Sequence, residues 1–349
     1  MPPLHLLALL RQWQMQHRRR ARIYRPRIHI LGFTDTECLQ RFRLDRAAIL
    51  YLCQLLDDQL SSRSVHPHNL PVLVKVCAAL SVLASGSFQR VAGDAIHISQ
   101  ASVCRCLNQF IEAMLLHTGR FIQFPTTAAE RRAIKAGFYR VAGFPNVLGA
   151  IDCTHVSIRA PAANEHVYRD RRRRHSMNVQ VVCDHTMLIT SVCAKFPGSA
   201  HDAYILRNST LHPKMERLAN NGVWLIGDRG HPLMPWLMTP FVNPPTAAEV
   251  RYNNSHASTR SIIERTFGVL KSRFRCLDDS GGCLLVTPGK VCRMTTVCCM
   301  LHNMAVRRRL PMPVVPPQDP QDPDMDEPDE QPVGRAVEVR QQIVDQYFR

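Results

Sequence analysis

The stretch from Val147 to Ile158, V-L-G-A-I-D-C-T-H-V-S-I, carries an aspartate in the middle of a run rich in Val, Ile and Ala. A run of this kind predicts a buried β-strand. Similar runs predict strands at Asn178–Cys183 and Met187–Phe196, and V-W-L-I-G at Val223–Gly227 predicts a short fourth strand. Asp228 follows that fourth strand directly, so two aspartates are attached to predicted strands.

Helices are expected around these strands. Ala203–Asn220 is predicted as one helix between the third and fourth strands, and Ser258–Phe274 as a helix with an apolar face. Gly289–Arg309 and Ala336–Phe348 are predicted as two later helices. Three strands, a helix, a fourth strand and then helices predict an α/β sandwich, which we place at residues 140–310.

Residues 1–125 are predicted to form a helical domain, because apolar residues recur at helical spacing, as in Arg46–Leu60. Within it, residues 87–111 have the outline of a helix-turn-helix. A short helix is expected to end near Gly93, and Ser99 is a good N-cap for a second helix. Such a second helix can enter a DNA major groove. The alternative is an ordinary helical hairpin in a bundle.

The charge of the chain is strongly basic, with a formal net charge of +16 and a pI of about 9.7. Residues 311–334 are rich in proline, hold seven acids and no Lys or Arg, and predict a disordered linker before a C-terminal helix at 335–349. The rest of the chain therefore carries +23, which indicates a polyanionic partner such as nucleic acid. The basic cluster at His17–Arg22 fits a nuclear import signal and a solvated surface equally well.

Thirteen cysteines include no C-x-x-C pair, and most lie among apolar residues. Buried reduced thiols in a cytosolic or nuclear protein are the better account than a zinc knuckle or disulfides. The apolar run Leu4–Leu10 precedes its positive charges and does not read as a signal peptide, and no stretch is long enough to span a membrane. We therefore expect a soluble intracellular protein.

Asp152, Asp228 and Glu264 stand in apolar surroundings, and Asp202 follows P-G-S-A-H after the third predicted strand. A carboxylate beside apolar strand residues loses hydration, which is unfavourable unless a cation, a set of hydrogen bonds or a proton compensates. Carboxylates that converge from different elements suit Mg²⁺ or Mn²⁺. Taken singly, each has a structural alternative: a strand-end hydrogen bond for Asp152, a turn for Asp228, and a surface pair with Arg260 or Arg265 for Glu264. Together they favour a metal site, and two ions about 3.5–4 Å apart could stabilise both oxygens of a displacement at phosphorus.

Basic residues near these acids are candidates for DNA contacts. Arg171, Arg172, Arg173 and Arg174 lie between the first two predicted strands, where a loop that contacts phosphate is favoured over a merely solvated hairpin. Lys271, Arg273 and Arg275 follow Glu264 on what we predict to be the same helix.

Several motifs follow one another along the chain: I-D-C-T-H-V, P-G-S-A-H-D, L-I-G-D-R-G-H-P-L and I-E-R-T-F-G-V-L-K-S-R-F-R-C-L, with C-C-M-L-H-N near the end. Together they closely resemble the PIF/Harbinger transposase family, including its domesticated nuclease members. The resemblance runs from about residue 40 to 305. It implies an RNase H-like mixed sheet with an Asp-Asp-Glu site in which Asp152, Asp228 and Glu264 match the three acids. It also implies Asp202 as a further metal ligand. The resemblance departs at Arg229 and His231, where the family usually has Ser and Tyr.

The function implied by this resemblance is metal-dependent cleavage of DNA with Mg²⁺ or Mn²⁺, without full transposase activity. A catalytically silent DNA-binding or adaptor protein that keeps the fold is the alternative. The resemblance further implies a separate Myb/SANT-like DNA-binding partner and a nuclear location, with the cytoplasm as a second compartment.

Overall fold

The computed structural model describes residues 32–62, 69–279, 282–314 and 334–349, together with positions 5, 9, 12 and 13. The predicted basic cluster at 17–22 lies outside the described residues, as do most of the apolar run at 4–10 and most of the predicted linker at 311–334.

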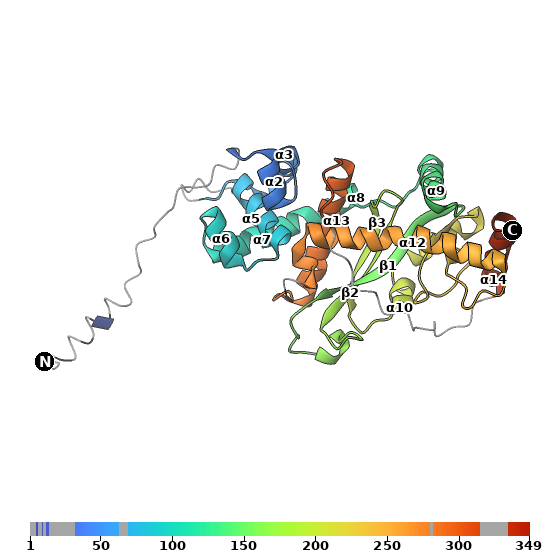
Figure 1. Cartoon of the computed structure of the whole chain (residues 1–349). Helices are drawn as coiled ribbons and strands as arrows, with labels where there is room; N and C mark the ends of the chain where they lie inside the picture. Colours follow the sequence, from blue (N-terminus) through green and yellow to red (C-terminus); the bar gives the residue numbers. More distant parts are fainter. Residues whose placement is uncertain are drawn as a thin grey trace.

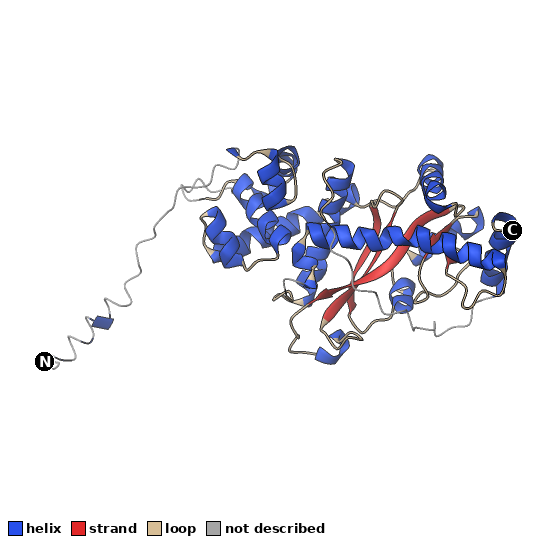
Figure 2. Ribbon diagram, viewed as in Figure 1, coloured by secondary structure: helices blue, strands red, loops and turns tan. Residues whose placement is uncertain are grey.

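A five-stranded mixed sheet in the order β3-β2-β1-β4-β5 forms the centre of the molecule (Figure 2). Strands β1, β2 and β3 pair antiparallel, whereas β4 pairs parallel with both β1 and β5. This topology with flanking helices is RNase H-like, which confirms the predicted fold class. The strand bounds are β1 (Val147–Ser157), β2 (Ser176–Cys183), β3 (Ile189–Pro197), β4 (Trp224–Ile226) and β5 (Leu237–Met238). The two-residue β5 was not expected, because so short a strand leaves no periodic signal.

The two faces of the sheet are covered by different helices. Successive residues of a strand point to opposite faces. On β2, Val181 therefore joins the core under α9 (Ala128–Ala142), α12 (Ala247–Arg273) and α13 (Pro288–Arg307), whereas Val182 joins a smaller core with residues of α10 and α11. Figure 1 shows α12 running across the sheet. The two faces of β1 thus meet different helices.

The segment Ala203–Asn220 is not the single helix that we predicted. It forms α10 (Asp202–Arg207), α11 (His212–Leu218) and a short 3₁₀ turn, Ala219–Asn221. The side chains of Asn208 and Ser209 donate hydrogen bonds to carbonyl oxygens of the last turn of α10, at 2.9 Å and 2.8 Å. Pro213 near the start of α11 lacks the N–H that a continuous helix would need.

Helix α12 begins at Ala247, well before the predicted start at Ser258. Thr246 caps it by accepting a hydrogen bond from the backbone N–H of Glu249 at 3.2 Å. Its first turns are polar, so the apolar period revealed only the later part of the helix. Helix α9 was missed altogether, although Thr127 and Glu130 form a capping box that marks its start.

The N-terminal region is helical, as predicted (Figure 1). Its helices are α2 (Asp35–Phe42), α3 (Arg46–Leu55), α4 (Asp57–Leu60), α5 (Val72–Ser85), α6 (Gln89–Ile96), α7 (Gln100–Leu115) and α8 (Thr118–Phe121). The helix-turn-helix outline is present in α6 and α7, and Ser99 caps α7 as expected. Helix α6 ends at Ile96 and not near Gly93 as expected. The next residue, His97, takes a left-handed conformation that ends the helix. DNA reading by this unit stays a prediction.

A C-terminal helix, α14 (Gly334–Tyr347), packs beside α12. Arg251 of α12 donates two hydrogen bonds to the carbonyl oxygen of Phe348, at 2.9 Å and 2.7 Å. The Phe348 ring lies against Phe144 and Tyr252. The last residues of the chain therefore help to fix the N-terminal half of α12.

All thirteen cysteines lie in the described part of the chain and are free thiols, as expected. Across the described ranges, no helix is both long and apolar enough to cross a membrane.

Candidate metal centre

Three aspartates converge where β4 ends beside the middle of β1. Asp152 lies on β1, Asp228 follows β4, and Asp202 is the first residue of α10. Because β1 and β4 are parallel neighbours with Ala150 opposite Ile226, Asp152 in the middle of β1 lies level with Asp228 just after β4. One carboxylate oxygen from each aspartate lies within 4.8 Å of the others. The structure thus brings together three of the four acids expected from the sequence.

Burial makes this cluster electrostatically unfavourable without a cation. Asp152 and Asp228 are only 5% and 7% exposed. Burial raises the pKa of the Asp152 carboxyl well above its ordinary value, and the nearby charge of Asp228 raises it further, whereas Arg260 opposes the shift. The cluster therefore needs protons or positive charge, and a divalent cation would supply the latter.

The surroundings of the three aspartates fit a divalent cation. Hydrogen bonds hold two of the carboxylates: the backbone N–H of Cys153 donates to Asp152 Oδ1 at 2.7 Å, and Asn178 Nδ2 donates to Asp202 Oδ1 at 3.0 Å. At Gly230, a Cβ would lie 3.4 Å from Asp228 Oδ1 and 3.6 Å from Asp202 Oδ2. Glycine therefore leaves open the space that faces these oxygens. The donor set is all carboxylate, as hard cations such as Mg²⁺ and Mn²⁺ prefer.

Glu264 stands apart from the three aspartates. It lies on α12, and its carboxylate is not part of the group of oxygens within 4.8 Å. Arg260, one turn earlier on the helix, has Nη2 2.5 Å from Glu264 Oε1 and Nη1 3.5 Å from Asp152 Oδ2. The guanidinium group thus lies between the first and last acids of the predicted set. The pairing of Glu264 with Arg260 that the sequence left open is present, and Arg260 also reaches the site.

The two departures from the family motif behave differently. Arg229 is exposed and donates to the carbonyl oxygen of Phe241 at 3.4 Å. His231 is buried, and its Nδ1 lies 2.6 Å from Asp228 Oδ1. Burial alone would lower the pKa of His231, but the hydrogen bond and the charges of the three aspartates outweigh it and raise the pKa to about 9. Of the two, His231 is therefore part of the site.

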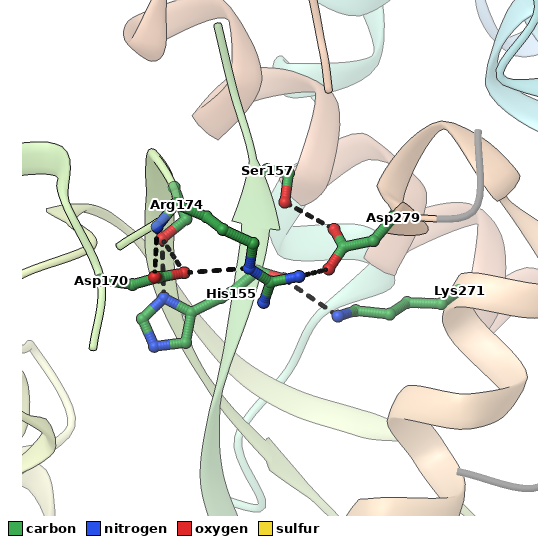
Figure 3. A network of polar contacts seen from close by, with 7 residues as sticks. His155, Ser157, Asp170, Arg174, Lys271 and Asp279 are labelled. Atoms are coloured by element: carbon green, nitrogen blue, oxygen red, sulfur yellow. Dashed lines mark hydrogen bonds and ion pairs between the residues drawn. The ribbon is translucent and has the colours of Figure 1, made fainter. Parts of the chain in front are cut away.

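The arginine-rich loop between β1 and β2 is anchored at its base (Figure 3). Arg174 Nη1 lies 2.7 Å from Asp279 Oδ2, and its backbone N–H donates to Asp170 Oδ1 at 2.8 Å. Ser157 also donates to Asp279, at 2.6 Å. Arg171, Arg172 and Arg173 are exposed at the turn, with Arg173 in a left-handed conformation. The network ties this loop to the segment that follows α12.

The basic residues after Glu264 do not share one exposed face. Lys271 is half-buried, and its ammonium group donates to the carbonyl oxygen of His155 at 2.9 Å (Figure 3). Burial lowers the pKa of Lys271. Arg273 is buried, so its side chain is not exposed for the contact with DNA that the sequence suggested. Arg275 is exposed and lies beyond the end of α12, in a 3₁₀ turn (Arg275–Leu277).

Three residues of the site had been given no role in metal binding from the sequence. They are Arg260, Asn178 and His231. A signal existed for Arg260, because residues four apart on a helix are neighbours and Arg260 precedes Glu264 by four. Asn178 gave no such signal, because its contact with Asp202 depends on how α10 packs on β2.

The fold and the site together define a class of nucleases. They combine a central β1 with a parallel β4, buried aspartates in the middle of β1 and just after β4, and a glutamate on a long helix across the sheet. Residues 151–303 match the family described as DDE superfamily endonuclease. No solved structure matches the chain significantly.

Curated relatives place the chain more closely. It is 41% identical to "Putative nuclease HARBI1" of Homo sapiens over 78% of each chain, and 38% identical to the Rattus norvegicus protein of that name over 90% of this chain and 91% of the relative. "Protein ALP1-like" of Arabidopsis thaliana is 28% identical over 79% of this chain and 72% of the relative. The chain therefore belongs to the DDE superfamily endonucleases, in the family of the Harbinger transposase-derived nuclease HARBI1.

Proposed function

We propose that the protein is a metal-dependent endonuclease that hydrolyses DNA phosphodiesters, without full transposase activity. The observation that carries this proposal is the convergence of the carboxylates of Asp152, Asp202 and Asp228 within 4.8 Å, where β4 ends beside the middle of β1. Membership of the family supports the reaction class.

Each acidic residue of the site has its own role in this proposal. Asp152, Asp202 and Asp228 would hold Mg²⁺ or Mn²⁺, with Asn178 fixing the orientation of Asp202. Glu264 would complete the catalytic set of Asp152, Asp228 and Glu264 when Arg260 moves away from it. When bound, divalent cations would activate water for attack and neutralise charge on the departing oxygen.

Binding of the substrate is assigned to the basic residues. The exposed arginines at 171–173 and Arg275 would contact phosphates, with Arg174 holding the loop through Asp170 and Asp279. Lys271 has three donors and uses one on His155, so it can still face a phosphate near the end of α12. A Myb/SANT-like DNA-binding protein is proposed as a partner, and the nucleus, with a cytoplasmic pool, as the location.

A second candidate function is a catalytically silent DNA-binding or adaptor protein. It is favoured by Arg260, whose guanidinium group lies between Asp152 and Glu264, where a second cation would have to bind. In that case the fold and the basic surface would be retained without turnover.

Nicking of supercoiled plasmid by the full-length protein in Mg²⁺ or Mn²⁺ tests these two functions. The matched variants are Asp152→Asn and Asp58→Asn, the latter changing an exposed aspartate of α4. We expect the wild type and Asp58→Asn to nick and Asp152→Asn to be inactive. Equal nicking by all three would refute the metal-site mechanism. DNA binding without nicking by the wild type would favour the adaptor.

A further inference from the structure

A second set of ligands lies on the other face of β1. Adjacent strand residues point to opposite faces, so Asp152 lies on the side of α12 and Cys153 on the side of α10. There, Cys153, Asp202 and His231 each offer one ligand atom, and these atoms lie within 4.8 Å of one another. In a tetrahedral zinc site, bonds of about 2.0–2.3 Å put neighbouring ligand atoms about 3.6 Å apart. Small side-chain adjustments would therefore bring these three to one ion.

One ring nitrogen of His231 is available to a ligand. Its Nδ1 lies 2.6 Å from Asp228 Oδ1, whereas Nε2 is buried and has no hydrogen-bond partner among the described residues. Histidines that bind metals are commonly held in this way, with one ring nitrogen on a carboxylate and the other on the ion. A buried nitrogen left without a partner is otherwise unfavourable.

We propose that Cys153, Asp202 and His231 bind a borderline-soft transition metal, with Zn²⁺ as the prime candidate, through Cys153 Sγ, an Asp202 oxygen and His231 Nε2. A thiolate, an imidazole and one carboxylate suit Zn²⁺ and not Mg²⁺, which takes oxygen ligands. Binding converts the Cys153 thiol to a thiolate and removes the proton from His231 Nε2, and both protons are released to solvent. Cys153 and Asp202 are both partly exposed, so an ion can reach them.

Asp202 belongs to both ligand sets. An Asp202 carboxylate drawn toward Cys153 and His231 would be a poorer ligand for the ion held with Asp152 and Asp228. Zn²⁺ at the mixed site would therefore weaken binding of Mn²⁺ by the three aspartates and lower cleavage. This competition rests on the proposed nuclease function, whereas the mixed site itself does not.

Co²⁺ is a spectroscopic substitute for Zn²⁺ that reports ligation by thiolate. On adding Co²⁺ to the reduced full-length protein, we expect a thiolate-to-Co²⁺ charge-transfer band in the near ultraviolet, lost when Zn²⁺ is added. The band should be absent in Cys153→Ser and unchanged in Cys193→Ser, which alters another half-buried thiol, on β3. In His231→Gln the affinity for Co²⁺ should fall by at least about tenfold.

No thiolate band in the wild type, or one that persists unchanged in both Cys153→Ser and His231→Gln, would overturn the proposal. If Cys153→Ser does not fold, His231→Gln alone decides. Competition is read separately from the Mn²⁺ electron paramagnetic resonance signal: Zn²⁺ should release bound Mn²⁺ from the wild type and not from Cys153→Ser. A Co²⁺ band with no binding of Mn²⁺ would support the mixed site and count against the nuclease.

Discussion

The two halves of the acidic site differ in how far they are assembled. The three aspartates are placed by backbone topology, on β1, after β4 and at the first residue of α10, and their oxygens already lie within 4.8 Å. Glu264 is placed by side-chain pairing, because Arg260 holds it at 2.5 Å. In the proposed mechanism, strand order pre-forms one cation position, and Arg260 lies where a second cation would bind.

The largest effect is expected from the assembled half. Asp228→Asn removes a buried ligand and the partner of His231, so we expect the rate of plasmid nicking to fall by at least about 10³-fold, equivalent to about 4 kcal/mol of the barrier. Single-turnover nicking in Mn²⁺ measures this, with Asp58→Asn as the control. A fall of less than tenfold would mean that Asp228 does not hold the ion.

A change at Arg260 tests the part of the site beside Glu264. Arg260→Met keeps the length of the side chain and removes its charge, so a second Mn²⁺ no longer competes with the guanidinium group for Asp152 and Glu264. We expect the affinity for a second Mn²⁺ to rise about tenfold, or about 1.4 kcal/mol, in calorimetric titration. Arg265→Met, an exposed change on the same helix, is the control. An unchanged second affinity would show that Arg260 does not obstruct this position.

A change at Gly230 tests whether the first cation binds beside Asp228 and Asp202. In Gly230→Ala, the new Cβ would face the oxygens of Asp228 and Asp202 at ordinary contact distances and displace water from around the ion. We expect a loss of about threefold in Mn²⁺ affinity, or about 0.7 kcal/mol. Gly119→Ala on α8, where an added Cβ meets nothing within 4 Å, is the matched control. Equal affinities in both variants would place the ion away from Gly230.

The smallest effect should come from the exposed loop. Arg172→Ala removes one proposed phosphate contact outside the acidic site. The slope of log affinity for duplex DNA against log salt should then become shallower by about 0.9, with Mn²⁺ binding unchanged. Fluorescence anisotropy across a salt series measures the slope. A parallel line displaced downward would indicate that Arg172 acts on affinity without releasing counterions.

Much of the fold could be predicted because its signals are local. The apolar runs gave β1 to β4 within a few residues, and Ser99 gave the start of α7. Errors arose where local signals were absent or misleading: the polar first turns of α12, and the break between α10 and α11 at Asn208 and Ser209.

The acidic residues of the site were predicted from the sequence, whereas most contacts of its basic side chains were not. Asp152, Asp228 and Glu264 followed from their apolar settings and motif order, and Asp202 from the family resemblance. Glu264 does not join the other three within 4.8 Å. Arg229, adjacent in sequence to Asp228, turns its side chain toward Phe241. The pair of Arg260 with Glu264 was one of the alternatives that the sequence left open. The reach of Arg260 to Asp152 and the contact of His231 with Asp228 depend on packing.

Binding of Mn²⁺ to the purified protein tests most directly whether the aspartates form a metal site. Titration followed by electron paramagnetic resonance compares the wild type with Asp152→Asn and with Asp58→Asn. The account predicts that the wild type and Asp58→Asn bind Mn²⁺ with equal affinity and that Asp152→Asn loses at least about tenfold. Equal binding by all three proteins would contradict it.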